Sequence, residues 1–186
     1  MQTADNVAKW FLQNNQAGVL SGDADYITNL KLQKLLYYAQ GMNLALNDEC
    51  LFADPIVAWS YGPVVESVYD TYKVNGSDSI KVFEPPADNF TDAEEDALYL
   101  TQDAFGQYSA WKLSEMTHTE APWQNTARNQ IISVNTIREY FKAHYLESGE
   151  YPMTSEMRAT LADCRAGRNL IGAFDTPESL FKSLGI

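Results

Sequence analysis

The sequence is poor in the residues on which most metal and thiol chemistry depends. Its 186 residues include two cysteines, Cys50 and Cys164, and two histidines, His118 and His144. Cysteines this few and this far apart exclude a disulfide framework and favour a reducing compartment. Neither a Cys-x-x-Cys nor a His-x-x-x-His spacing occurs. We therefore expect no metal site and no bound cofactor.

Basic residues are also scarce, with 13 Lys and Arg against 25 Asp and Glu, a net charge of −12. An acidic surface repels phosphate backbones, which disfavours direct nucleic-acid binding. The excess either favours a basic protein partner or serves solubility alone. Long apolar runs are missing too, and none approaches the roughly 18 residues of a membrane helix. With no secretory signal at the N-terminus, the sequence predicts a cytoplasmic protein without a membrane partner.

What is present predicts a helical core. Hydrophobic residues make up 45% and aromatic residues 12% of the chain. Helical periodicity is found in residues 3–14, 29–46 and 135–147 and in segments that begin at Pro63, Thr91 and Ala110. The predicted fold class is therefore mainly α: a compact domain of about six helices, with a C-terminal helical extension. We also expect a small two-stranded β element in which residues 56–59 pair with residues 80–83.

Residues 29–46 are predicted to form the central helix, because they are apolar on two faces. Leu32 and Leu36 lie on one face and Tyr37 lies on nearly the opposite one. Lys31 and Lys34 share a further side with Tyr38. Buried lysines must keep their ammonium groups near water or carboxylates. The two lysines are expected to form either an exposed basic patch or an ordinary solvated face.

The charge balance changes near Gly149. Residues 1–149 hold 20 of the 25 acidic and 9 of the 13 basic residues, whereas residues 150–186 hold five and four. This contrast predicts a helical domain over residues 1–149 and an interaction extension over residues 150–186. Within the extension, Thr176-Pro177-Glu178 starts a helix of about two turns, which is marginal alone in water. It must dock on the domain, on a second copy in a homodimer, or on another protein.

No catalytic motif stands out, so we expect a protein that is not an enzyme. His118 and Glu120 could be two metal ligands, but further ligands are lacking. These two residues and Tyr61 are the only plausible active-site residues in the sequence. The aromatic residues Trp59, Tyr61 and Trp123, together with His118, either anchor an interface or fill the core. His144 is expected to pack on an apolar helix face.

Residues 30–41, LKLQKLLYYAQG, resemble the signature of the Panacea domain, also called SocA-like or phage-associated GepA-like. The resemblance continues in AWSYGPVV at residues 58–65, in LSEMTH at residues 113–118 and in Pro122-Trp123, and it covers about residues 1–147. The residues of the family motif are Lys31, Leu32, Gln33, Lys34, Leu36, Tyr37, Tyr38, Trp59, Tyr61, Gly62, Pro63, Val64, His118, Pro122 and Trp123.

This resemblance implies a prophage-type antitoxin of a type II toxin–antitoxin system. Such a protein neutralises a cognate toxin by direct protein–protein binding. The alternative is a SocA-like proteolytic adaptor that delivers the toxin to a cytoplasmic AAA+ protease.

The C-terminal segment is similar to the tails of RelB/DinJ-type antitoxins, which wrap their toxins. This second resemblance leaves open whether the body or the tail contacts the toxin. It predicts a helix-in-groove contact in the tail. The partner-binding residues that it implies are Arg165, Arg168, Leu170, Phe174, Leu180, Phe181 and Leu184.

Overall fold

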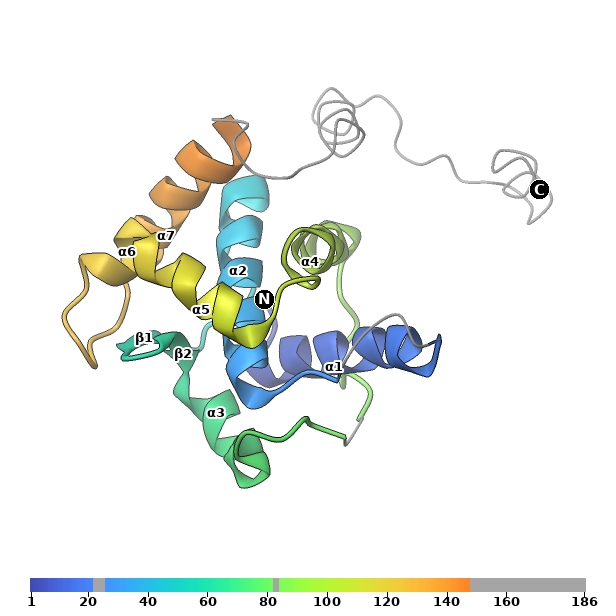
Figure 1. The fold of residues 1–186 in the computed structure, drawn as a ribbon. Coiled ribbons are helices and arrows are strands. Elements are labelled where there is room, and N and C mark those ends of the chain that lie inside the picture. The colour runs from blue at the N-terminus through green and yellow to red at the C-terminus, as the bar shows by residue number, and fades with distance from the viewer. Residues whose placement is uncertain (22–25, 82–83, 148–186) are drawn as a thin grey trace, which may run out of the picture. The chain divides into compact units, whose positions relative to one another are not determined.

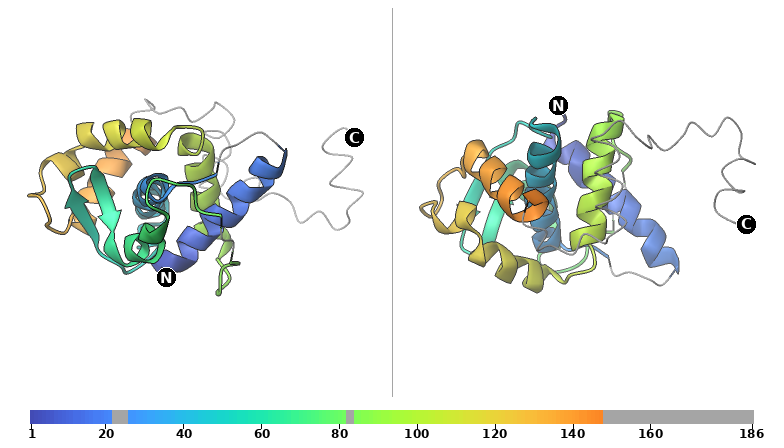
Figure 2. Two further views of the ribbon diagram at one scale, coloured as in Figure 1. Left: turned by 60° about the horizontal axis from the view of Figure 1, so that its bottom comes forward. Right: turned by 90° about the horizontal axis from the view of Figure 1, so that it is seen from above.

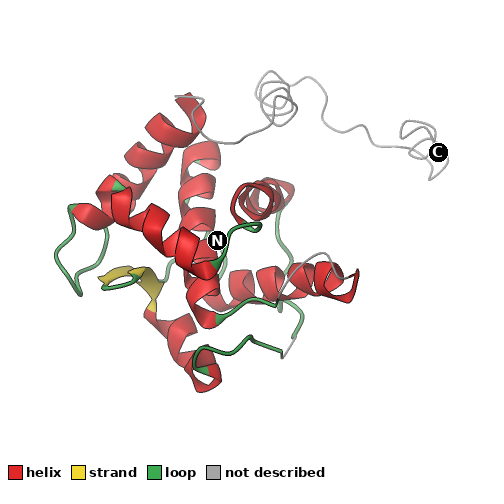
Figure 3. Cartoon of the chain, viewed as in Figure 1, coloured by secondary structure: helices red, strands yellow, loops and turns green. Residues whose placement is uncertain are grey.

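A computed structural model describes residues 1–21, 26–81 and 84–147 of the chain. They form seven α-helices and one β-hairpin, so the predicted mainly α fold class is confirmed (Figures 1 and 3). The predicted boundary near residue 149 and the whole 150–186 extension lie outside the described residues. The helices are α1 (Ala4–Ser21), α2 (Asn29–Asn47), α3 (Glu66–Tyr72), α4 (Asp92–Phe105), α5 (Ala110–Thr119), α6 (Ala121–Gln124) and α7 (Val134–Phe141). A 3₁₀-helix, Lys73–Asn75, follows α3, and a π-helix, Lys142–Glu147, follows α7.

Helix α2 lies at the centre of the fold, as its two apolar faces predict. In the end-on view of Figure 2 (left panel) the other elements surround it. The helix begins where the Thr28 side chain accepts a hydrogen bond from the Lys31 amide, and it ends at Asp48 in the left-handed conformation (φ 60°). All residues from Leu32 to Ala45 are buried.

The polar side chains of α2 hold the segment that follows the helix. Gln40 accepts from the Leu51 amide at 2.9 Å and donates to the Phe52 carbonyl at 3.1 Å. Gln33 accepts from the Val65 amide at 2.9 Å. Buried backbone groups need such partners, because an unpaired one costs about 1–3 kcal/mol. Helix α2 therefore fixes the path of the chain through residues 51–65.

The two strands β1 (Ile56–Trp59) and β2 (Gly62–Val65) form an antiparallel hairpin with a two-residue turn. The predicted pairing of residues 56–59 with residues 80–83 was wrong, because β1 pairs with β2. The Ile80 amide instead donates to the Ile27 carbonyl at 2.9 Å. The expected helix start at Pro63 was also wrong, since α3 begins at Glu66.

Pro63 can stand in β2 because its partner Ala58 is hydrogen-bonded on its other side. The Ala58 amide donates to the Gln130 carbonyl at 2.9 Å, and the Ala58 carbonyl accepts from the Asn129 amide at 2.8 Å. The missing N–H of Pro63 therefore leaves no gap in the hairpin. Nothing local in the sequence marks residues 129–130 as this partner.

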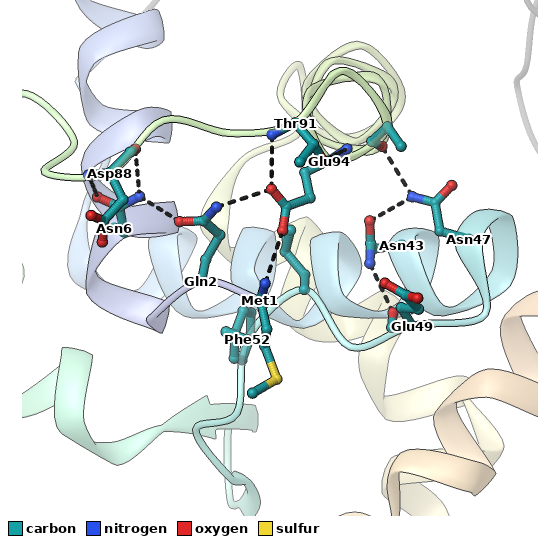
Figure 4. Close-up of polar contacts among 12 residues, drawn as sticks. Met1, Gln2, Asn6, Asn43, Asn47, Glu49, Phe52, Asp88, Thr91 and Glu94 are labelled. Atoms are coloured by element: carbon teal, nitrogen blue, oxygen red, sulfur yellow. Dashed lines mark hydrogen bonds and ion pairs between the residues drawn. The ribbon is translucent and has the colours of Figure 1, made fainter.

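The N-terminal residues are fixed to α4 through Glu94, which belongs to the capping box that Thr91 and Glu94 predict (Figure 4). Gln2 donates to Glu94 at 2.9 Å, and the N-terminal ammonium lies 3.5 Å from the same carboxylate. Helix α1 is longer than the predicted 3–14 and continues to Ser21. None of the described helices combines the length and the apolar character that crossing a bilayer requires.

Replacing Gly62 with Ala tests the packing beneath the hairpin turn. Gly62 has φ +101°, and an added Cβ would lie 2.5 Å from Thr117 Oγ1 and 2.8 Å from Lys34 Nζ. We expect Gly62→Ala to lower the free energy of unfolding by about 2–4 kcal/mol in urea titrations, through overpacking and backbone strain. Gly76→Ala is the matched control, because Gly76 also has positive φ but nothing within 4 Å. Equal losses for the two variants would contradict this packing.

Candidate functional site

Lys34 lies beneath the hairpin turn and is fully buried. Its ammonium donates to the Pro63 carbonyl at 2.9 Å. The expectation that Lys34 lies near water or carboxylates, on a basic patch or a solvated face, was wrong. The chain brings a backbone carbonyl to the ammonium instead, and Gly62 lets the hairpin approach it closely.

Burial lowers the pKa of Lys34 to about 7, because an ammonium in an apolar interior loses its hydration. The amine therefore changes its charge near neutral pH. Lys31, by contrast, is only half-buried and donates to the Gly106 carbonyl at 2.6 Å. The two lysines that are three residues apart in α2 hold different segments of the backbone.

Helices α5 and α6 also hold the hairpin through side-chain hydrogen bonds to its backbone. Ser114 of α5 donates to the Tyr61 carbonyl at 2.8 Å, and the Trp123 indole of α6 donates to the Trp59 carbonyl at 2.9 Å. His118 stacks on Trp123 with ring centroids 4.2 Å apart. The pKa of His118 is lowered by burial and then by the charge of Lys34, while the Ser60 backbone opposes both.

The structure brings seven motif residues together where α2, the hairpin, α5 and α6 meet, and we call this place the junction. Apart from the half-buried Lys31, the others lie in the core. The seven are Lys34, Trp59, Tyr61, Gly62, Pro63, His118 and Trp123. Leu32, Leu36, Val64 and Pro122 are buried packing residues, and Gln33 binds the Val65 backbone. Tyr61 is one of the aromatic residues that were expected either to fill the core or to anchor an interface. It is 61% exposed and therefore does not fill the core.

Tyr37 and Tyr38 belong to a second cluster, centred on the buried Glu120. Its carboxylate accepts from Tyr37 at 2.7 Å, from Tyr38 at 2.9 Å and from Tyr145 at 2.6 Å. Burial raises the pKa of Glu120, whereas the three hydroxyl donors oppose that rise. This carboxylate joins α2 to the π-helix Lys142–Glu147 and works as a structural acceptor.

The three residues that could have formed an active site, Tyr61, His118 and Glu120, lie in separate surroundings. Glu120 is engaged by three tyrosines, His118 lies on Trp123, and Tyr61 lies at the exposed turn. His144 was expected to pack on an apolar face, which was wrong. It is exposed, lies in the π-helix and stacks on Tyr140 with ring centroids 4.1 Å apart.

Sequence reasoning did not identify Ser114, Thr117 and Trp111 as parts of the junction. Ser114 and Thr117 are buried on α5, and Trp111 lies on the same helix beside Tyr61. The resemblance of residues 113–118 to the family motif is the one sequence signal that points to this helix. The predicted tail residues Arg165 to Leu184 lie outside the described residues.

A cleft of about 600 Å³ lies elsewhere, between the middle of α1, residues 86–90 and the start of α4. Its acidic lining comes from Asp88, Asp92 and Glu95, with Trp10 and Phe90 beside them. None of the motif residues lines it. Within the described residues, no group of three or more His, Cys, Asp or Glu is placed to hold a metal ion.

These features define a helical domain organised around one buried helix, with seven of its motif residues gathered in and around a hairpin. The sequence profile described as "Antitoxin SocA-like, Panacea domain" matches residues 32–124, which include Lys34, the hairpin and Glu120 but not Tyr145. The chain belongs to this family.

One curated relative is the antitoxin SocA of Caulobacter vibrioides (strain NA1000 / CB15N). It is 32% identical over 112 residues, and the match covers 52% of this chain and 58% of that protein. The chain thus spans little more than half the length of that relative. No solved structure matches the chain.

Replacing Lys34 with Met should remove a pH dependence of stability. The pKa of Lys34 is about 7 in the folded protein, against an ordinary 10.5, so the unfolded chain binds more protons between these values. The free energy of unfolding therefore rises with pH in this window, by about 1.4 kcal/mol per unit for one group. We expect Lys34→Met to flatten the slope between about pH 7 and 9 in urea titrations. Lys73→Met, at an exposed lysine paired with Asp70, is the control, and an unchanged slope in Lys34→Met would contradict the assignment.

Removing the Glu120 carboxylate should destabilise the domain strongly. Glu120→Ala leaves three buried hydroxyls without their acceptor, which we expect to cost about 3–5 kcal/mol in thermal or urea unfolding. Glu120→Gln keeps one acceptor oxygen and should lose less. Because the pKa of Glu120 is raised, its contribution to stability should fall as pH rises through that value. Glu115→Ala, at an exposed position of α5, should change little, and similar losses at both positions would refute the cluster's role.

Proposed function

We propose that this protein is a cytoplasmic antitoxin of a type II system that neutralises a cognate toxin by direct protein–protein binding. The observation that carries the proposal is the match of residues 32–124 to the SocA-like antitoxin family. The similarity to a curated antitoxin over 112 residues supports it.

The geometry of the two clusters agrees with a binding role. The Lys34 ammonium is occupied by the Pro63 carbonyl, and the Glu120 carboxylate by three tyrosine hydroxyls. Groups engaged in this way stabilise a fold and present no free acid, base or nucleophile to a substrate. On this proposal the protein makes and breaks no bond.

The charge of the chain indicates the kind of toxin. An excess of 25 acidic over 13 basic residues attracts a basic partner and raises the association rate at low salt. The predicted contact of the tail through Phe174, Leu180, Phe181 and Leu184 remains part of this proposal. A helix of about two turns would gain its stability on the toxin surface.

Co-expression with the product of the adjacent gene tests the proposal. We expect that product alone to stop growth, the pair to restore growth, and the two purified proteins to form a stoichiometric complex. Complex formation should weaken as salt rises. A neighbour that is harmless alone, or still toxic in the presence of this protein, would contradict the proposal.

A measurement of toxin lifetime in the same cells distinguishes neutralisation by binding from delivery to a protease. After protein synthesis is stopped, the lifetime of the toxin is measured with and without the antitoxin. Direct masking predicts an unchanged or longer lifetime. A shorter lifetime that depends on an AAA+ protease would instead establish the adaptor alternative.

A further inference from the structure

Two large aromatic side chains stand exposed beside each other on the described surface. Tyr61 at the hairpin turn and Trp111 on α5 are each 61% exposed, and their ring centroids lie 6.4 Å apart. We call them the aromatic pair. Large aromatic side chains exposed together on a surface often mark an interaction site.

The aromatic pair rests on a rigid base. The Tyr61 carbonyl accepts from Ser114, which lies one turn from Trp111 on the same helix. Gly62 packs closely against Thr117 and Lys34, and Lys34 holds the Pro63 carbonyl. The backbone that carries both rings is therefore ordered before any partner arrives, which lowers the entropy cost of binding.

The surroundings of the aromatic pair are rich in aromatic residues. Trp59, next to the turn, packs against Tyr69 at 4.9 Å, and Trp123 donates to the Trp59 carbonyl. Three of the four tryptophans of the chain thus belong to the hairpin and the helices that hold it. Tryptophan and tyrosine are the residue types most enriched among interface positions that carry binding energy.

The part of the chain that carries the aromatic pair has a net negative charge, which attracts a cation. Residues 1–149 hold 20 acidic and 9 basic residues. Lys112, the basic residue next to Trp111, is paired with Glu115 at 3.6 Å, and Glu66 accepts from the Trp59 indole at 3.2 Å. The faces of aromatic rings attract ammonium and guanidinium groups, and an acidic surface strengthens that attraction.

We propose that Tyr61 and Trp111 form the docking surface of the body for a segment of the toxin that carries arginine or lysine. This inference rests on the proposed antitoxin function and adds to it a contact in the body, separate from the tail. The cationic head group of the segment lies over the rings, and its aliphatic stem packs against their edges.

Variants of the full-length chain test the contact in titrations against the purified toxin. We expect Tyr61→Ala and Trp111→Ala each to raise Kd by about tenfold or more. Trp111→Phe, which keeps a π face, should stay within about threefold of the wild type. Trp111→Leu is apolar without a π face and should bind as weakly as Trp111→Ala.

Tyr99→Ala is the matched control, because Tyr99 is 54% exposed but lies on α4 beside Trp10. It should bind the toxin with wild-type affinity. Each variant is first checked for a cooperative thermal transition. Since both rings of the aromatic pair are mostly exposed, their removal should leave the fold intact.

The outcomes separate this inference from the proposed function. If the wild type binds and neutralises the toxin but the two alanine variants do so equally well, the docking surface is wrong and the antitoxin function stands. If Trp111→Leu keeps wild-type affinity, the partner is not a cation. If the alanine variants instead turn a dimer into a monomer in light scattering, the surface belongs to a second copy. If the wild type neither binds nor neutralises, the proposed function fails first.

Discussion

The hydrogen bond from the buried Lys34 ammonium to the Pro63 carbonyl is the interaction on which the hairpin depends. It places a titratable group where the central helix, the hairpin turn and α5 meet. The turn reaches this group because Gly62 has no side chain there. The same closeness lets Ser114 hold the Tyr61 carbonyl, and so sets the position of the exposed turn.

The residues of the family signature build an interior more than a surface. Gln33, Lys34 and Gln40 use their polar ends to bind the backbone of residues 51–65, and Tyr37 and Tyr38 engage Glu120. The exposed position beside Tyr61 belongs to Trp111, which lies outside the signature.

The central helix and the caps were predictable because their signals are local. Two apolar faces mark residues 29–46 as buried, and Thr91 with Glu94 marks the start of α4. The hairpin was not predictable from local signals. Pro63 is typical of a helix start. The backbone groups that make Pro63 acceptable in a strand lie far along the chain, at residues 129–130. The Glu120 cluster was missed for the same reason, since Tyr145 is 25 residues away and becomes a neighbour only in the fold.

We propose that the protein works by surface complementarity through a body whose aromatic turn is held rigidly in place. Hydrogen exchange of the full-length chain, with and without its purified toxin, measures this most directly. We expect the toxin to slow exchange at the amides of residues 59–66 and 110–116 and to leave the interior of α2 unaffected. A stable complex without added protection in either segment would contradict it.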